Sequence, residues 1–230
     1  MNSHRFFEFD FVQAELLSGK QNIFQNKEEN IYIVGTDEAG RGPGAGDVFS
    51  AAVYFPIINE NLISELSKLN DSKKLSENTR EDLYKIITKN SIWSVCQGTV
   101  AQIEKTNILE TTLWTMKKAC EEVIIKAELK NPFILVDGNK LIRNFKYNQK
   151  WIKKGDSLSA SIAASSIIAK VTRDRYMNEL DKKYPQYDWK NNKGYLTKTH
   201  LDAVDKYGLT QYHRKSFFTK HFQKQMSLSF

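Results

Sequence analysis

Two adjacent carboxylates, Asp37 and Glu38, stand where an apolar run meets a glycine-rich loop in the segment IYIVGTDEAGRGPGAG, residues 31–46. A glycine-rich loop after a strand commonly binds phosphate, because its backbone N–H groups and the next helix N-terminus attract an anion. Two negative charges at the start of the loop would repel that phosphate. The pair therefore points to a chemistry in which cations stand between the carboxylates and a phosphate group.

Two more carboxylates have comparable positions. Asp137 ends the apolar run PFILVD, and Asp156 lies in KKGDSLS, just before an alanine-rich segment. Because ligands of open sheets collect at strand ends, all four carboxylates are predicted to converge there. Their mutual repulsion then calls for cations, and hard oxygen ligands suit Mg²⁺ or Mn²⁺. Two such ions about 4 Å apart can activate a water and stabilise both oxygens of an in-line displacement at phosphorus.

Each carboxylate taken alone could equally form a turn or cap a helix. Neighbouring residues on a regular strand also point to opposite faces of the sheet. Asp37 and Glu38 are therefore expected to share one site only if the chain is distorted there, which the glycines that follow would permit.

The glycines allow a second interpretation. Gly40, Gly42 and Ala45 satisfy the pattern G-x-G-x-x-A of dinucleotide-binding loops. The preceding carboxylates, Pro43 within the loop and a predicted strand downstream all oppose it. No acidic residue ends that next strand to hold a ribose, because Pro56 follows it. A dinucleotide site is therefore not favoured.

Hydrophobic periodicity predicts the elements that position these residues. Strands are predicted at residues 31–36, 48–55, 91–100 and 132–137, and helices at 76–89, 107–130 and from 158 onward. Ser76 and Asn107 are the predicted N-caps of the first two helices. The aromatic, basic segment 184–222 is predicted to hold one or two short helices. The order of elements indicates an α/β or α+β domain with a mixed central sheet flanked by helices.

The bulk composition narrows the class of protein. The 230 residues have 40% hydrophobic and 27% charged side chains, which is typical of one globular domain. A net charge of +7 favours a polyanionic partner, nucleic acid above all. Cys96 and Cys120 lack the spacing of a zinc site or a disulfide framework. Neither a signal peptide nor a membrane-spanning run is recognisable, so we expect a cytoplasmic protein without a membrane partner.

Seven motifs occur in an order that closely resembles ribonuclease HII, the bacterial type 2 ribonuclease H. They are DEAGRGPGAG (37–46), DSKKLS (71–76), NILETTLWTM (107–116), VDG (136–138), KGDS with SIAASSIIAKVTRD (within 154–174), KGYLTKTH (193–200) and HRKSF (213–217). The resemblance implies a ribonuclease H-like fold with a five-stranded mixed sheet and a C-terminal helical segment. It also implies metal-dependent hydrolysis of the RNA strand in RNA–DNA hybrids, and nicking 5′ to a single ribonucleotide embedded in duplex DNA, which leaves a 3′-hydroxyl and a 5′-phosphate.

The resemblance also implies roles for particular residues. The family's catalytic, metal-binding carboxylates match Asp37, Glu38, Asp137 and Asp156, which would hold two divalent ions, Mg²⁺ or Mn²⁺. Its GRG element matches Gly40, Arg41 and Gly42, and its junction-sensing tyrosine matches Tyr195. Glycine lets backbone amides approach a minor groove, where the 2′-hydroxyl distinguishes RNA from DNA. Phosphates would be contacted by Lys73, Lys74 and the basic, aromatic residues after position 184.

Several positions depart from the family or leave alternatives open. Asp47 stands where proline is common and is expected to add negative charge near the site and loosen the loop. Leu196 replaces a proline and Gly44 a larger residue, which puts the sharpness of junction recognition in question. Asp174 in VTRD is expected to be a surface or local salt-bridge residue. His200, His213 and Arg214 match family positions, with a structural role equally open.

Two alternative functions remain at this point. Ribonuclease HIII typically adds an N-terminal substrate-binding domain and lacks the GRG arginine, whereas only about thirty residues precede the first strand here and Arg41 is present. A non-catalytic binder of hybrids is expected to have lost one of the four carboxylates, and all four are retained.

The sequence divides into an N-terminal extension (1–30), a catalytic domain with its C-terminal helical part (31–218) and a flexible tail (219–230). In the tail, Gln225, Leu228 and Phe230 form Q-x-x-L-x-F, which resembles the motif that docks bacterial replication proteins on the sliding clamp. A terminal segment can place two apolar anchors in a groove. The alternative is a polar tail that binds no partner. The chain is expected to be a monomer.

Overall fold

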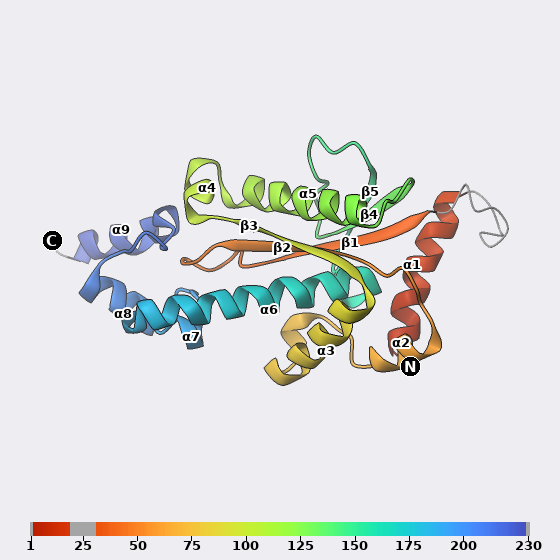
Figure 1. Cartoon of the computed structure of the whole chain (residues 1–230). Coiled ribbons are helices and arrows are strands. Elements are labelled where there is room, and N and C mark those ends of the chain that lie inside the picture. Colours follow the sequence, from red (N-terminus) through yellow and green to blue (C-terminus); the bar gives the residue numbers. More distant parts are fainter. Residues whose placement is uncertain (1, 19–30, 229–230) are drawn as a thin grey trace.

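Five strands form a mixed sheet in the order β3-β2-β1-β4-β5 in the computed structural model, which describes residues 2–18 and 31–228 (Figure 1). They are β1 Tyr32–Ala39, β2 Val48–Tyr54, β3 Ile92–Gly98, β4 Pro132–Asp137 and β5 Asn148–Ile152. Strands β1, β2 and β3 pair antiparallel, whereas β4 is parallel to both β1 and β5. The predicted α/β architecture with a mixed central sheet is confirmed.

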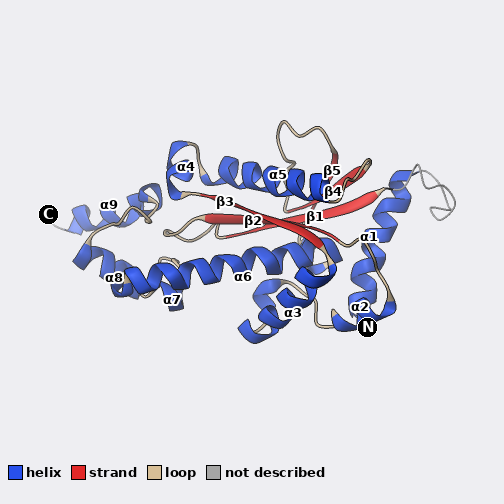
Figure 2. Cartoon of the chain, viewed as in Figure 1, coloured by secondary structure: helices blue, strands red, loops and turns tan. Residues whose placement is uncertain are grey.

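Helices cover both faces of this sheet (Figures 1 and 2). Helix α5 (Ile108–Lys126), preceded by α4 (Val100–Lys105), packs on one face, and the long helix α6 (Ala160–Lys183) packs on the other. On the α6 side lie α1 (Asn2–Ser18), α2 (Glu60–Glu65) and α3 (Glu77–Asn90). Beyond the C-terminal end of α6 lie α7 (Trp189–Asn192), α8 (Lys198–Tyr207) and α9 (Thr219–Leu228). Short 3₁₀ helices connect them: η2 (Ser72–Lys74), η3 (Gly155–Ser157), η4 (Pro185–Tyr187) and η5 (Lys215–Phe218).

The sheet is buried on both faces because successive side chains alternate between two cores. On β2, Ala51 and Val53 belong to the core under α6, whereas Ala52 belongs to the core under α5. Helix α6 approaches β1 so closely that a β-carbon added at Gly35 would lie 2.2 Å from the carbonyl carbon of Ser161. Only glycine allows this distance, and it brings the start of α6 against the strand that carries two of the predicted catalytic residues.

Most of the predicted elements are present. Ser76 and Asn107 cap α3 and α5 through their side-chain oxygens, as predicted. Besides the short helical segments α2, α4, η2 and η3, two longer elements were missed, α1 and β5. The first interleaves its aromatic residues with charges, and the second is a largely exposed edge strand without an apolar run. Neither has a clear hydrophobic period.

The C-terminal helical segment has its own core, which is rich in aromatic side chains such as Tyr187, Trp189 and Phe218. The sequence predicted too few helices in residues 184–222, one or two short ones, whereas 3₁₀ and α-helical turns alternate there around this core. Residues 219–228 were predicted as a flexible tail but form α9, where Phe218 stacks on Phe222. Within the described part of the chain, no helix has the length and apolar character needed to cross a membrane.

Candidate functional site

The strand that carries Asp37 and Glu38 stays regular, so the predicted distortion is wrong. Antiparallel pairing of β1 with β2 continues without a break through Asp37, Glu38 and Ala39. The parallel pairing with β4 stops at the pair Thr36 and Val136, so both carboxylates lie just beyond it. Asp37 is only 5% exposed, and its Oδ1 accepts a 2.7 Å hydrogen bond from the backbone N–H of Glu38.

The other two carboxylates lie at the neighbouring strand end and at the start of α6. Asp137 is the last residue of β4, and its Oδ1 accepts a 2.7 Å hydrogen bond from the N–H of Gly155. Asp156 follows in η3, which begins after Lys154 in a left-handed conformation with φ of 56°. The turn that carries Asp156 is therefore tied to the end of β4 by the Asp137 side chain.

The four carboxylates lie close enough together to interact electrostatically. Burial, then the negative charges of Glu38, Asp137 and Asp156, raise the pKa of Asp37 well above its ordinary value. Burial and Glu38 raise the pKa of Asp137, against hydrogen bonds from Gly155 and its neighbours. Burial and then Asp137 raise the pKa of Asp156 to about 6. Clustered acids of this kind are stabilised by a bound cation.

The donor set fits a hard divalent cation. All four side chains are carboxylates, and oxygen ligands are those that Mg²⁺ and Mn²⁺ prefer. Among the residues that the structure describes, no three acidic, histidine or cysteine side chains are already arranged so that they could hold one ion. The fit therefore rests on the chemistry and shared location of the four acids, and no coordination geometry follows from it.

A fifth carboxylate, Asp71, lies beside this cluster and was missed by the sequence analysis. After burial and Asp137, Asp71 is the next contribution that raises the pKa of Asp156, and Lys73 opposes it. The Asp71 side chain accepts a 2.9 Å hydrogen bond from the Lys73 N–H at the start of η2. Partial burial acts to lower the pKa of Lys73, but attraction to Asp37, Asp71 and nearby acids prevails and raises it. The DSKKLS motif was the available signal, since Asp71 is its first residue.

Two buried arginines hold the glycine loop by hydrogen bonds to its carbonyl oxygens. Arg214 is completely buried, and its guanidinium donates to the carbonyl oxygens of Gly40 (2.7 Å), Arg41 (3.2 Å), Pro43 (2.7 Å) and Gly46 (2.6 Å). Arg173 donates to the carbonyl oxygens of Ala45 (3.1 Å), Asp47 (3.1 Å) and Lys193 (3.0 Å). Gly40 has φ of +99°, and a β-carbon there would lie 2.1 Å from Arg173 Nε. The loop is thus fixed by its carbonyl oxygens.

Asp47 does not loosen this loop, so that expectation was wrong. Its carboxylate is buried, and it accepts hydrogen bonds from Gln97 Nε2 (2.5 Å) and from the N–H of Val100 at the start of α4 (2.8 Å). Its negative charge also supports the buried guanidinium groups of Arg173 and Arg214. The extra negative charge therefore serves as a counter-charge inside the protein, because buried cations need one.

Tyr195 lies beside the GRG element, as the resemblance implies for a junction-sensing residue. Its side chain is 48% exposed, and a β-carbon added at Gly42 would lie 3.3 Å from Tyr195 Cε1. Two departures from the family pattern also fit each other: a β-carbon at Gly44 would lie 2.4 Å from Leu196 Cδ2. Leu196 therefore occupies the space that a larger residue at position 44 would need.

A chain of buried hydrogen bonds fixes the backbone at Tyr195. The Thr210 N–H donates to His213 Nδ1 (2.8 Å), and His213 Nε2 lies 3.1 Å from His200 Nε2. Trp189 Nε1 also donates to His200 Nε2 (3.1 Å), which must therefore be an acceptor. His200 Nδ1 then donates to the Tyr195 carbonyl oxygen (2.9 Å). Burial lowers the pKa of both histidines, to about 3 for His213, and keeps the pair neutral.

The remaining predicted residues are placed as follows. Arg41 is half exposed, and its Nη1 lies 3.4 Å from Glu38 Oε1. Asp174 is buried rather than on the surface, and it pairs with Lys170 at 2.6 Å and Arg80 at 3.9 Å, so only the predicted salt bridge is confirmed. Backbone positions 225 and 228 lie in α9, while the side chains of Gln225 and Leu228, and all of Phe230, lie outside the described residues.

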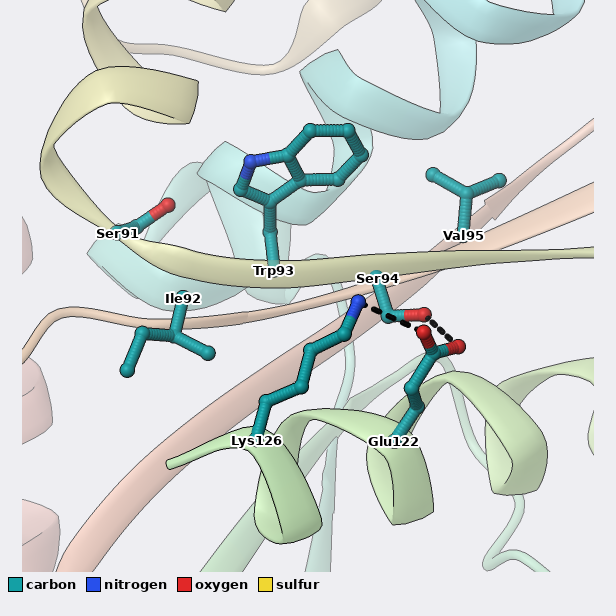
Figure 3. A pocket seen from close by; sticks show the side chains of 7 residues that line it. All are labelled: Ser91, Ile92, Trp93, Ser94, Val95, Glu122 and Lys126. Carbon is teal, nitrogen blue, oxygen red and sulfur yellow. Dashed lines mark hydrogen bonds and ion pairs between the residues drawn. The ribbon is translucent and has the colours of Figure 1, made fainter. Parts of the chain in front are cut away.

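A hollow of about 520 Å³ lies at the opposite side of the sheet, along the edge strand β3 and the C-terminal part of α5 (Figure 3). Within it, Glu122 accepts a hydrogen bond from Ser94 and pairs with Lys126 at 2.7 Å. Strand β2 separates β3 from β1, and the residues that line this hollow include none of the four carboxylates. Its acid is satisfied internally and contributes nothing to the cluster.

The chain is similar in sequence to a known protein family. The model of the family Ribonuclease HII matches residues 34–224. A ribonuclease HII of Rickettsia akari (strain Hartford) is 50% identical over 194 residues, which are 84% of this chain and 95% of that protein. A ribonuclease HII of Wolbachia pipientis wMel is 47% identical over 193 residues, 84% of this chain and 92% of that protein.

Solved structures show the same fold. The ribonuclease H2 of Pyrococcus horikoshii OT3 has a TM-score of 0.62 at 26% identity, over 80% of this chain and 93% of that one. The ribonuclease HII in the PCNA:RNase HII complex of Archaeoglobus fulgidus has a TM-score of 0.64 at 23% identity, with the same coverage. Bst-RNase HIII in complex with Mn²⁺ has a TM-score of 0.60 at 16% identity, over 90% of this chain and 68% of that one.

Proposed function

The chain belongs to the ribonuclease HII family, and we propose that it hydrolyses the RNA strand of RNA–DNA hybrids and nicks duplex DNA 5′ to single embedded ribonucleotides. The products are a 3′-hydroxyl and a 5′-phosphate. One observation carries the proposal: Asp37, Glu38, Asp137 and Asp156 interact electrostatically at the adjoining ends of β1, β4 and the start of α6.

These four carboxylates would hold two divalent cations, Mg²⁺ or Mn²⁺, which when bound would activate a water and neutralise the charge that develops at phosphorus. Support for a metal of this class comes from the donor chemistry and from the Mn²⁺ complex of Bst-RNase HIII, a protein of the same fold. The side chains of this protein supply the orientation. Gly155 holds the Asp137 carboxylate, and the Glu38 N–H holds that of Asp37. Lys73 adds a positive charge beside the cluster.

Recognition of the ribonucleotide is assigned to the glycine loop and Tyr195. With the carbonyl oxygens of Gly40 and Arg41 held by Arg214, residues 40–42 can present backbone N–H groups to a minor groove, where the 2′-hydroxyl is accessible. The ring of Tyr195, next to Gly42, can stack on the sugar of the following deoxynucleotide. A 2′-hydroxyl on that sugar would obstruct the stacking, which would favour a junction from RNA to DNA.

The test uses a labelled DNA duplex with one ribonucleotide and a long RNA–DNA hybrid, each with Mg²⁺, Mn²⁺ or EDTA. We expect one metal-dependent nick 5′ to the ribonucleotide, and a loss of activity of at least about 10³-fold in Asp37→Asn, since an electrostatic site group is removed. Cleavage of the long hybrid alone would contradict the junction specificity and leave the carboxylate chemistry in place. Binding without cleavage of either substrate would instead support a non-catalytic protein.

Family membership bears on the alternative that this is a ribonuclease HIII. The sequence relatives at 45–50% identity are named ribonuclease HII, whereas Bst-RNase HIII shares only the fold. Arg41, the arginine of the GRG element, is also present. The HII activity is therefore the one we propose.

A sliding clamp is the proposed protein partner. An archaeal ribonuclease HII was solved in a complex with PCNA, and the last six residues of this chain contain Q-x-x-L-x-F. Deletion of residues 225–230 is expected to abolish retention on immobilised bacterial clamp without changing the rate of hydrolysis. Equal retention of the full and shortened chains would exclude this motif as the docking segment.

A further inference from the structure

The segment that joins two of the carboxylates is strongly basic. Between Gly138 and Gly155 it contains six cationic side chains and no acidic one, in a protein whose net charge is +7. We call residues 139–154 the basic segment; its cations are Lys140, Arg143, Lys146, Lys150, Lys153 and Lys154. It begins immediately after Asp137 and Gly138, and it ends at the turn that carries Asp156. A large positive charge is thus covalently adjacent to the proposed catalytic cluster.

The basic segment is an ordered part of the fold. The Gln149 side chain closes its loop through two 2.8 Å hydrogen bonds with the N–H and carbonyl of Ile142, which is buried. Helix α5 holds the loop from one side, because Lys117 Nζ donates to the Asn144 carbonyl (2.5 Å) and Arg143 pairs with Glu110 (2.6 Å). The positions of its lysines are therefore set by the protein.

Three of these lysines have no internal counter-charge. Lys140, Lys153 and Lys154 are exposed, and their ammonium groups form no ion pair or hydrogen bond with another described residue. Some exposed lysines elsewhere do pair with an acid three residues away on the same helix: Lys85 with Asp82 (3.3 Å), Lys118 with Glu121 (3.0 Å) and Lys182 with Glu179 (2.6 Å). The charge beside the catalytic cluster is left available to an external anion.

An exposed tryptophan belongs to the same segment as these lysines. Trp151 is on β5, at the edge of the sheet, and its side chain is 47% exposed. Its register partner is Val136, the residue before Asp137. A large aromatic ring beside unpaired lysines is a common composition of nucleic-acid surfaces, where rings contact sugars or bases and ammonium groups contact phosphates.

We propose that the basic segment binds the phosphate backbone of the duplex that flanks the cleaved nucleotide, through Lys140, Lys153 and Lys154, with Trp151 in contact with the same flank. The proposal rests on the proposed function, since it assigns an additional surface to the same substrate. Nucleic acid is the partner because the segment adjoins the carboxylate cluster at both ends, so a polyanion bound there must pass close to these lysines. This surface lies on the β5 edge, away from the glycine loop and Tyr195 in the sequence.

The experiment measures binding to a duplex with one ribonucleotide, with Asp37→Asn in every protein so that the substrate stays intact. The test variant is Lys140→Gln/Lys153→Gln/Lys154→Gln. The control is Lys85→Gln/Lys118→Gln/Lys182→Gln, which removes the same charge from paired lysines elsewhere. We expect the slope of log Kd against log salt to fall by roughly 2 to 3 in the test variant, about 0.9 for each lost phosphate contact. The control is expected to keep the slope of the parent protein.

Duplexes shortened on one side of the ribonucleotide and then on the other locate the contact. On the duplex that lacks the contacted side, the slope of log Kd against log salt for the parent protein is expected to fall to that of the test variant. The two proteins should then bind this duplex with equal Kd. Equal slopes for test and control variants on the full duplex would overturn the proposal, and would leave an acidic protein as the partner to test. Failure of the proposed function is separate, since it would appear as absent cleavage by the protein with Asp37 restored.

Discussion

Tyr195 is held by its own C-terminal segment and by the glycine loop, which is distant in sequence. Its carbonyl oxygen accepts from His200, whose tautomer is set by His213 and Trp189, and its ring lies against Gly42. The ring is half exposed, so it can meet a substrate without first leaving a packed position. Preorganisation of this kind makes the contact more favourable, because less conformational entropy is lost on binding.

We expect Tyr195→Ala to reduce kcat/KM on a duplex with a single ribonucleotide by about 10- to 100-fold, the value of one stacked ring. The loss on a long hybrid should be smaller, since many junction-independent contacts remain. Tyr195→Phe keeps the ring and should stay close to the wild type. Steady-state kinetics on both substrates measure this, and equal losses on the two substrates would contradict a junction-sensing role.

At the scale of elements, α1 and α6 are joined by a buried carboxylate. Asp10 on α1 accepts hydrogen bonds from Ser159 Oγ (2.5 Å) and from the N–H of Ser161 (2.9 Å), in the first turn of α6. Helix α1 lies outside residues 34–224, which match the family. Helix α1 therefore caps the element next to Asp156 from outside the matched residues, and the predicted boundary at residue 30 remains a prediction.

Asp10 also predicts a dependence of stability on pH. Burial raises its pKa to about 6, against hydrogen bonds from Ser159 and Ser161. The folded protein holds this proton more tightly than the unfolded chain, so the contribution of Asp10 to stability is greatest below pH 4 and falls until about pH 6. Asp10→Asn removes this titration. Between pH 4 and pH 7, its unfolding free energy should therefore improve relative to wild type by about 2 kcal/mol.

Urea unfolding at a series of pH values measures this difference. A constant difference between the two proteins across the range would show that the pKa of Asp10 is not raised. Asp10→Ala serves as a second comparison, because it also lacks the titration but loses the cap. It should be less stable than Asp10→Asn by about 1 kcal/mol.

At the scale of the whole molecule, Arg214 and Arg173 connect the C-terminal helical segment to the glycine loop. Arg214 belongs to the C-terminal part yet donates to four carbonyl oxygens between Gly40 and Gly46. Burial and the nearby Arg173 lower the pKa of Arg214 to about 9, which leaves it charged at neutral pH. The sheet that carries the carboxylate cluster and the segment with Tyr195 are thereby held as one unit.

Arg214→Lys is expected to lower the free energy of unfolding by about 3 kcal/mol, since one ammonium group cannot reach this set of carbonyls and several buried acceptors lose their donors. The exposed Arg175 pairs with Glu81 at 2.6 Å and offers a matched control. Arg175→Lys should change stability by less than about 1 kcal/mol. Denaturant unfolding compares them, and similar losses in the two variants would show that the buried hydrogen bonds are not the cause.

The sequence by itself determined the family and most of the local structure. The four acids, the glycine loop and the aromatic residue after Gly194 are recognisable because motifs are local in sequence. Helix caps such as Ser76 and Asn107 were also predictable, since a cap depends on residues three positions away. The edge strand β5 was not, because an exposed strand lacks the alternation by which strands are recognised.

Only the tertiary structure decided where the buried polar groups find their partners. Asp47 was expected to disturb the loop, but it pairs with Gln97 and the start of α4. Arg214 and Gly40 are 174 residues apart, and Asp10 and Ser161 are 151 apart. The physical reason is common to these cases. A buried charge or hydrogen-bonding group must be satisfied by whatever the packed elements bring beside it, and local periodicity carries no record of that neighbour.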